Sequence, residues 1–225
     1  MSWTDLESLR TINRLKEEFK IRHFIETGAY KGTNALVQSK NFQFITTCEI
    51  NKELYEIAKE RLKKYKNIFI YNLDSVDYLL KIYRIINPDE IVFIYLDAHF
   101  YDPKLKNKFH VLKELNAIAK NEYNCIIAIH DFDNGEFGHI TYDGQQLNFA
   151  LLTEKLKDIN KDFHYYTNTE CDIITNGKEI DIDDQEVEET LKFVWSKEDK
   201  GKRGILYCIP KELDLTKYKL REIQA

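Results

Sequence analysis

The chain has 225 residues, of which 43% are hydrophobic and 32% charged, the balance of an ordinary globular protein. This length suffices for one sizeable core, so we predict a single domain over residues 1–225. The formal net charge of −5 argues against a protein that binds nucleic acid.

The four cysteines (Cys48, Cys125, Cys171 and Cys208) lie far apart and form no C-x-x-C pair. This spacing is typical of reduced, buried thiols rather than of disulfides or a zinc site. No apolar run reaches transmembrane length, and the N-terminus lacks the features of a signal peptide. We therefore expect a soluble, cytoplasmic protein without membrane contact.

Helix-like and strand-like segments alternate along the chain. The first helix falls within residues 1–20, where Thr4 and Glu7 form a candidate capping box. Later helices are expected over residues 33–38, 52–65, 76–85, 109–120 and 145–159. Strands are expected over residues 23–28, 42–50, 67–72, 90–99, 124–132, 163–168 and 204–210. This alternation predicts βαβ units and a mostly parallel sheet.

Residues 170–202 interrupt the alternation between the last two strands. They contain IITNGKEI, whose Asn-Gly pair between β-prone runs indicates a hairpin, and a short helix is expected over residues 186–193. We interpret the whole segment as an insertion. Its role is open between covering the site, an oligomer contact and neither.

The segment ETGAYKGT, residues 26–33, lies where the first strand turns into a helix. Glycines there let the backbone pass close to a ligand and leave helix N–H groups free. The segment is neither G-x-G-x-x-G nor a phosphate-binding loop ending in G-K-[ST]. Taken alone, it fits an ordinary strand-to-helix turn as well as a cofactor loop.

Acids end the next two strands. Glu49 follows Gly28 by roughly 20 positions, the place from which an acid accepts hydrogen bonds from ribose hydroxyls in a Rossmann-like unit. The competing interpretation is a solvated acid at a strand end. Asp74 opens a helix after the third strand, where it either contacts an adenine amino group or, like Ser75, caps the helix.

Taken in order, ETGAYKGT, CEIN, NLDS and YLDAH resemble the class I S-adenosylmethionine-dependent methyltransferases, and the first loop is close to that of catechol O-methyltransferases. The resemblance covers roughly residues 24–210. It implies an α/β, Rossmann-like, doubly wound sheet of seven strands, mostly parallel, with an antiparallel last strand and helices on both faces. It also implies S-adenosylmethionine as cofactor. The positions expected to bind it are Glu26, Thr27, Gly28, Tyr30, Gly32, Thr33, Glu49, Ile50, Asp74, Ser75 and Asp97.

Ionisable residues cluster after the fourth and fifth predicted strands, in Asp97-Ala98-His99 and in His130-Asp131-Phe132-Asp133. Ligands in open α/β sheets bind beyond the carboxyl ends of the strands, so both clusters should face one crevice. Four ionisable groups at two such ends, Asp97, His99, His130 and Asp131, are more than capping requires. A structural, hydrogen-bonded role remains the alternative for each histidine taken singly.

Two chemical roles fit these clusters. In one, Asp97 and Asp131, with Asp133, Asn134 or a histidine, bind Mg²⁺ or another divalent cation that lowers the pKa of a substrate hydroxyl. This resembles metal-dependent O-methyltransferases of the catechol and macrocin types, although Phe132 follows Asp131 where catechol enzymes carry Asn. In the other, His99 or His130 is the general base. The catalytic candidates are therefore His99, His130 and Asp97.

The sequence thus predicts an S-adenosylmethionine-dependent methyltransferase, with a hydroxyl on a small molecule or sugar as acceptor. The alternatives are a catalytically inactive methyltransferase-like binding protein and an NAD-dependent oxidoreductase. The glycine loop departs from the NAD fingerprint, which disfavours the oxidoreductase. A homo-oligomer is compatible with the sequence.

Overall fold

A computed structural model describes residues 6–99, 109–136, 141–142, 145–170 and 203–224. Thr4, the hairpin and helix expected within the insertion, and Cys171 lie outside the described residues. Cys48, Cys125 and Cys208 are buried free thiols, as predicted.

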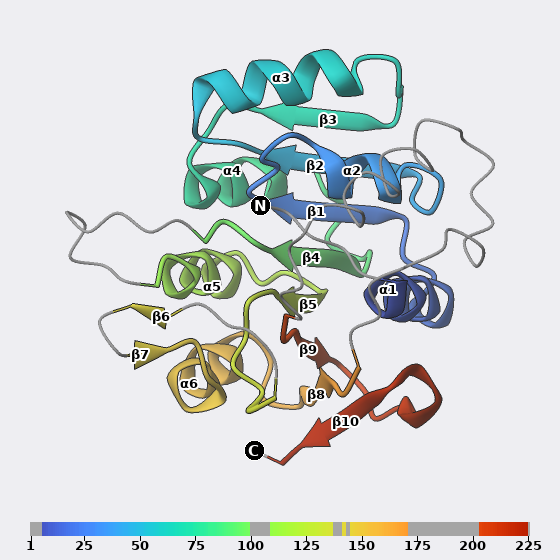
Figure 1. Cartoon of the computed structure of the whole chain (residues 1–225), viewed down its shortest axis with the longest axis vertical. Helices are drawn as coiled ribbons and strands as arrows, with labels where there is room; N and C mark the ends of the chain where they lie inside the picture. Colours follow the sequence, from blue (N-terminus) through green and yellow to red (C-terminus); the bar gives the residue numbers. More distant parts are fainter. Residues whose placement is uncertain (1–5, 100–108, 137–140, 143–144, 171–202, 225) are drawn as a thin grey trace.

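A sheet of eight strands in the order β10-β8-β9-β5-β4-β1-β2-β3 forms the centre of the structure (Figure 1). β3, β2, β1, β4 and β5 are parallel neighbours, whereas β9 runs antiparallel to both β5 and β8. The strands are β1 (His23–Thr27), β2 (Phe44–Cys48), β3 (Ile68–Tyr71), β4 (Val92–Leu96), β5 (Cys125–Ile129), β8 (His164–Asn168), β9 (Leu206–Ile209) and β10 (Leu220–Ile223). The predicted, mostly parallel α/β sheet is confirmed.

The predicted strand count of seven is wrong. The eighth strand, β10, pairs antiparallel with β8 at the edge of the sheet. Of its four residues only Leu220 is buried. A segment this short and polar cannot be distinguished from a loop by its sequence pattern. The hydrogen bonds to β8, rather than the local sequence, make this segment a strand.

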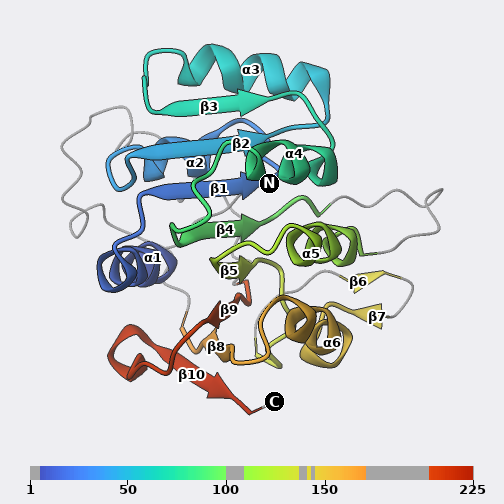
Figure 2. The ribbon, with the colours of Figure 1, turned by 180° about the vertical axis from the view of Figure 1, so that it is seen from behind.

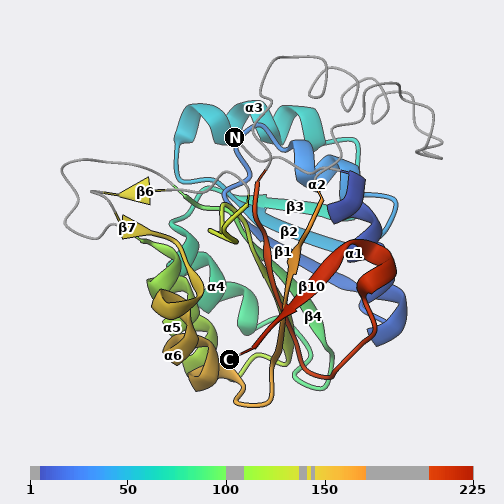
Figure 3. The same cartoon turned by 60° about the horizontal axis from the view of Figure 1, so that its bottom comes forward.

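Helices cover both faces of the sheet (Figures 2 and 3). α1, α2 and α3 pack in one apolar cluster with one face, and α4, α5 and α6 pack in a second cluster with the other. The helices are α1 (Leu6–Phe19), α2 (Thr33–Gln38), α3 (Lys52–Leu62), α4 (Ser75–Tyr83), α5 (Val111–Lys120) and α6 (Phe149–Ile159). The doubly wound arrangement is thus confirmed. None of these helices is long and apolar enough to cross a membrane.

The helix expected from residue 145 begins later, at Phe149. Asn148 is its N-cap, and the Asn148 side chain accepts a hydrogen bond from the Leu151 N–H. The residues before it pair instead, β7 (Gln145–Gln146) with β6 (Thr141–Tyr142), as a small separate sheet. The capping side chain of Asn148 therefore determines where α6 begins, although the residues before it have a helical pattern.

The two strands at the centre of the sheet explain the position of the candidate site. Every residue of β4 and of β5 is buried, because helices cover both faces of these strands. Both strands are parallel, so their carboxyl ends lie at the same edge of the sheet, beside the end of β1. The sequence clusters that follow β4 and β5 are therefore brought together.

Candidate functional site

The loop after β1 passes directly over the end of β4. Gly28 has φ of +80°, and a Cβ placed on it would lie 2.6 Å from the Asp97 carbonyl oxygen. The N–H groups of Gly28 and Ala29 both donate to the Cys48 carbonyl oxygen, at 3.1 and 2.8 Å. Glycine is therefore required at position 28 because three loops meet there, those after β1, β2 and β4.

Glu26 lies beneath this loop rather than on its surface. Its side chain is fully buried, and its two carboxylate oxygens accept hydrogen bonds from Asn34 Nδ2 at 2.8 Å and from Thr47 Oγ1 at 2.6 Å. These contacts tie the end of β1 to α2 and β2. Contact between Glu26 and a cofactor stays a prediction.

Glu49 connects the loops after β1 and β2. Its Oε2 accepts from the Tyr30 N–H at 2.8 Å, and its Oε1 accepts from the Asn51 N–H at 2.9 Å. Tyr30 adopts φ of +51°, in the left-handed region. Asn72, directly after β3, supports this arrangement, because its Nδ2 donates to the carbonyl oxygens of Glu49 and Ile50.

Asp74 and Ser75 begin α4. Asp74 is the N-cap, and its Oδ1 accepts from the Val76 N–H at 2.9 Å. Its Oδ2 lies 3.4 Å from His110 Nε2, at the start of α5. Asp74 therefore caps one helix and links it to the next, and its side chain stays partly exposed.

The remaining predicted positions of the cofactor loops differ in exposure. The Thr27 hydroxyl is buried and accepts from the Asp97 N–H at 3.3 Å. Gly32 precedes α2 with φ of +77°, and Thr33 Oγ1 accepts from Arg61. Ile50 leaves 62% of its surface exposed, next to Glu49.

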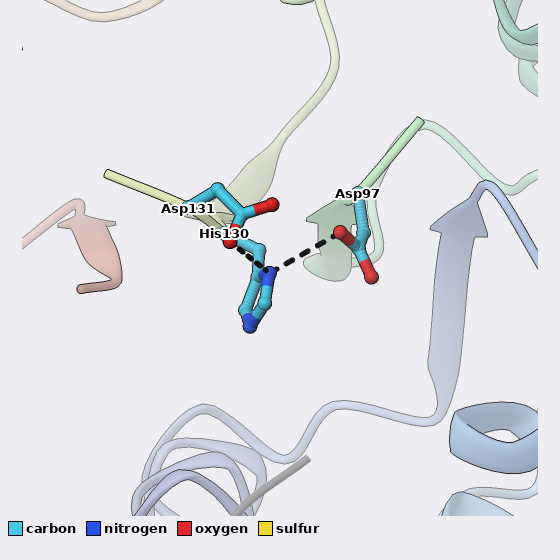
Figure 4. A group of neighbouring side chains, drawn as sticks. All are labelled: Asp97, His130 and Asp131. Atoms are coloured by element: carbon cyan, nitrogen blue, oxygen red, sulfur yellow. Dashed lines mark ion pairs between the residues drawn. The ribbon is translucent and has the colours of Figure 1, made fainter. Parts of the chain in front are cut away.

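Three side chains from the ends of β4 and β5 meet at this edge (Figure 4). His130 Nδ1 lies 3.2 Å from Asp97 Oδ1 and 3.5 Å from Asp131 Oδ1. Their ligand atoms all lie within 4.8 Å of one another. The structure therefore brings the two sequence clusters together, as predicted.

The charges in this group balance without a further ion. Burial lowers the pKa of His130, but Asp97 and Asp131 together raise it to about 10. The pKa of the Asp131 carboxyl lies below its usual range, because His130, His99 and Arg203 outweigh the opposite effect of burial. Arg203 Nε lies 3.1 Å from Asp131 Oδ1. Two cations therefore face two carboxylates.

His99 differs from His130 in both exposure and hydrogen bonding. It is partly exposed, and its Nε2 lies 2.9 Å from the backbone carbonyl oxygen of His130. A carbonyl oxygen only accepts, so Nε2 carries the proton and Nδ1 of the neutral ring keeps its lone pair. The hydrogen bond therefore fixes the tautomer that a general base needs.

Asp133, predicted as a metal ligand, is not part of the Asp97–His130–Asp131 group. Its Oδ1 accepts from the Gly135 N–H at 3.0 Å. Asp131 adopts φ of +54°, which turns the chain away from the cluster directly after the fifth strand. The third member of the group is therefore His130.

The structure adds residues that the sequence did not single out. Arg203 reaches Asp131 because Gly204 packs tightly against Phe132: a Cβ on Gly204 would lie 2.0 Å from the Phe132 carbonyl oxygen. Asn168 Nδ2 holds the Arg203 carbonyl oxygen at 2.9 Å. Glu114 of α5 is fully buried. Of these residues, only Arg203 and Gly204 lie in a segment with a sequence signal, the turn-like KGKRG before the last predicted strand.

Comparison with known proteins gives a fold. No protein-family model matches the sequence, and no curated protein matches it. Among solved structures, precorrin 8w decarboxylase from Methanobacterium thermoautotrophicum is similar, with a TM-score of 0.52 and 15% identity over 93% of this chain and 92% of that one. The methyltransferase domain of bacterial CtHen1-CN has a TM-score of 0.51 and 12% identity over 90% of this chain and 98% of the other.

A third similar structure is human methyltransferase 10 domain containing protein, with a TM-score of 0.52 and 11% identity over 94% of this chain and 86% of that chain. At such identities the likeness shows the fold alone. The chain has the Rossmann-like fold of the class I methyltransferases.

Proposed function

We propose that the protein is an S-adenosylmethionine-dependent methyltransferase that methylates a hydroxyl group of a small molecule or sugar. The observation that carries this proposal is the junction at Gly28. There the glycine loop, the Glu49 loop and the end of β4 meet at the carboxyl edge of the sheet. Nucleotide-derived ligands bind at this edge in open α/β folds.

The residues at this junction fit the proposed cofactor. Glu49 is held by two backbone N–H groups, and each carboxylate oxygen keeps a second lone pair for a ribose hydroxyl. Beside it, exposed Ile50 offers an apolar surface to a purine ring. Asp97 Oδ2 is buried and has no hydrogen-bond partner within the described ranges, so it suits a cationic group.

Methyl transfer asks the protein to align two reactants and to remove one proton. When bound, S-adenosylmethionine supplies an activated methyl group on a sulfonium. In this proposal His99 Nδ1 takes the proton of the acceptor, and the hydrogen bond of Nε2 to a backbone carbonyl oxygen supports that role. His130 does not suit this role, because a pKa of about 10 keeps it protonated at neutral pH.

A divalent cation is the competing route to an activated hydroxyl. Asp97, His130 and Asp131 offer two carboxylates and an imidazole, a donor set that suits Mn²⁺, Fe²⁺ or Zn²⁺ better than Mg²⁺. Binding of any cation would first displace the proton that His130 Nδ1 holds between the carboxylates, with Arg203 adding positive charge nearby. These residues therefore fit a protonated imidazole better than a metal.

Transfer of a labelled methyl group from S-adenosylmethionine to a panel of hydroxyl and amine acceptors tests the function. We expect only hydroxyl compounds to be labelled, and His99→Asn to lower kcat by about 100-fold or more with unchanged affinity for S-adenosylhomocysteine. Methylation of amines alone would refute the acceptor class. Binding without turnover on a broad panel would indicate a methyltransferase-like binding protein.

Chelation separates the two routes. The His99 route predicts that EDTA leaves the rate unchanged, because none of its steps needs a cation. A rate that EDTA abolishes and that Mn²⁺ or Mg²⁺ restores would replace the histidine base with a metal at Asp97, His130 and Asp131.

A further inference from the structure

Glu114 lies in the first turn of α5, on the face of the helix that packs into the core. Its side chain is 0% exposed, as are those of Leu115 and Ile118 on the same helix. Neither carboxyl oxygen of Glu114 has a hydrogen-bond partner among the described residues. A carboxyl group in such a place destabilises the fold, and an apolar residue would serve packing better.

The surroundings of Glu114 belong to the proposed cofactor crevice. Burial raises the pKa of the Glu114 carboxyl, whereas the hydroxyls of Ser75 and Thr27 and the charges of His110 and His99 lower it, so these groups lie near the carboxyl. The two hydroxyls approach it without completing a hydrogen bond of regular geometry. Thr27 ends β1 and Ser75 begins α4. Glu114 therefore lies near the end of β1 and the start of α4, the elements next to Gly28 and Asp74.

Ser75, like Glu114, has a buried polar group, its hydroxyl, that lacks a hydrogen-bond partner among the described residues. Two neighbouring polar groups that are both unpaired can satisfy each other after a small movement of either side chain. The hydroxyl and carboxyl are thus poised to bond when the start of α4 shifts toward α5.

We propose that Glu114 is a positioning residue for cofactor binding, which holds the start of α4 through the Ser75 hydroxyl. This inference rests on the proposed function, because the loop so positioned carries Asp74. Burial raises the pKa of Glu114 against the opposing effects of Ser75, His110 and His99, which shifts the carboxyl toward its acid form, the form that both donates and accepts a hydrogen bond. The energetic penalty of a buried acid is then offset when the cofactor is bound.

Two substitutions at this position separate hydrogen bonding from packing. Glu114→Gln keeps the shape and a donor and an acceptor, whereas Glu114→Met keeps the volume and removes both. In calorimetric titrations with S-adenosylhomocysteine we expect Glu114→Gln to stay within about threefold of the wild-type Kd and Glu114→Met to bind at least about tenfold more weakly. Without ligand, the Tm of Glu114→Met should equal or exceed that of the wild type.

Ile118→Met, one turn further along the same buried face, is the matched control for repacking and should bind as the wild type does. Ser75→Ala should weaken binding to a similar degree as Glu114→Met, and the double variant should be no weaker than the worse single variant. This second route keeps the proposal testable even if Glu114→Met does not fold.

Wild-type affinity in Glu114→Met or in Ser75→Ala would overturn the proposal, as would additive losses in the double variant. A wild-type protein that binds no S-adenosylhomocysteine would instead overturn the proposed function, and this inference with it. The two failures are distinguishable because the first spares the wild-type protein and the second does not.

Discussion

His130 is almost fully buried, yet two carboxylates flank its Nδ1 atom. Such a side chain stabilises the fold only while it is charged, because the neutral ring would leave Asp97 and Asp131 facing each other. At the scale of the single residue, the structure thus separates two histidines that look equivalent in the sequence. His130 lies buried between two carboxylates, whereas His99 is partly exposed and bonded through Nε2 to a backbone carbonyl oxygen.

The His130 interaction predicts a pH-dependent stability. The pKa of His130 in the folded state, about 10, lies above the ordinary value of 6.5. The stabilising effect of the charged imidazole is therefore complete below pH 6.5 and is lost as pH rises through about 10. We expect His130→Gln to lower the free energy of unfolding by about 3 kcal/mol near pH 6.5, with a smaller difference near pH 10. Urea unfolding of both proteins across this range measures it. A difference that does not shrink toward high pH would contradict a charged His130.

Not every feature of the site at this scale was readable from the sequence. Glu49 was proposed because its distance from the glycine loop has a physical meaning in a βαβ unit, and Asp74 because it opens the helix after the third strand. The third member of the Asp97–Asp131 group was left open among Asp133, Asn134 and a histidine, because the left-handed conformation of Asp131 (φ of +54°) cannot be read from residue types. Glu114 gave no signal, since one charged residue in an amphipathic helix normally faces water.

Among the elements, the loop after β1 is the most constrained. Gly28 needs both a positive φ and space for the Asp97 carbonyl oxygen. Gly135 has nearly the same φ, +82°, but nothing lies within 4 Å of a Cβ placed there. The two glycines therefore separate the effect of backbone conformation from that of the close approach.

Gly135→Ala should lower stability by about 1 kcal/mol, the strain of an alanine in the left-handed region. Gly28→Ala should lower it by at least about 2 kcal/mol more and also abolish binding of S-adenosylhomocysteine, since the loops must move apart. Thermal unfolding and titration of both variants measure these effects. Equal destabilisation by the two substitutions would mean that the close approach to Asp97 does not constrain the fold.

The strands at the centre of the sheet were predictable because burial on both faces leaves a continuous apolar run, as in β4 and β5. The edge was not. β10 depends on pairing with β8, and β7 replaced the start of a predicted helix because Asn148 caps α6 further along. The hydrophobic periodicity of the sequence does not predict elements that depend on a tertiary partner or on a single capping residue.

At the scale of the whole molecule, the candidate site residues lie at one edge of one sheet. Parallel strands bring the loops after β1, β2 and β4 to Gly28, and the ends of β4 and β5 to the Asp97–His130–Asp131 group. The fold is that of methyltransferases. That the crevice binds S-adenosylmethionine is the central claim, and its identity as an enzyme depends on it.

Calorimetric titration of the purified chain with S-adenosylmethionine and S-adenosylhomocysteine tests this claim most directly. We expect micromolar binding of both, weakened at least about tenfold in Glu49→Ala because the ribose loses its carboxylate partner. Glu53→Ala, an exposed acid in the first turn of α3, should bind as the wild type does. No binding of either ligand by the wild-type chain, or equal binding by Glu49→Ala, would contradict the account.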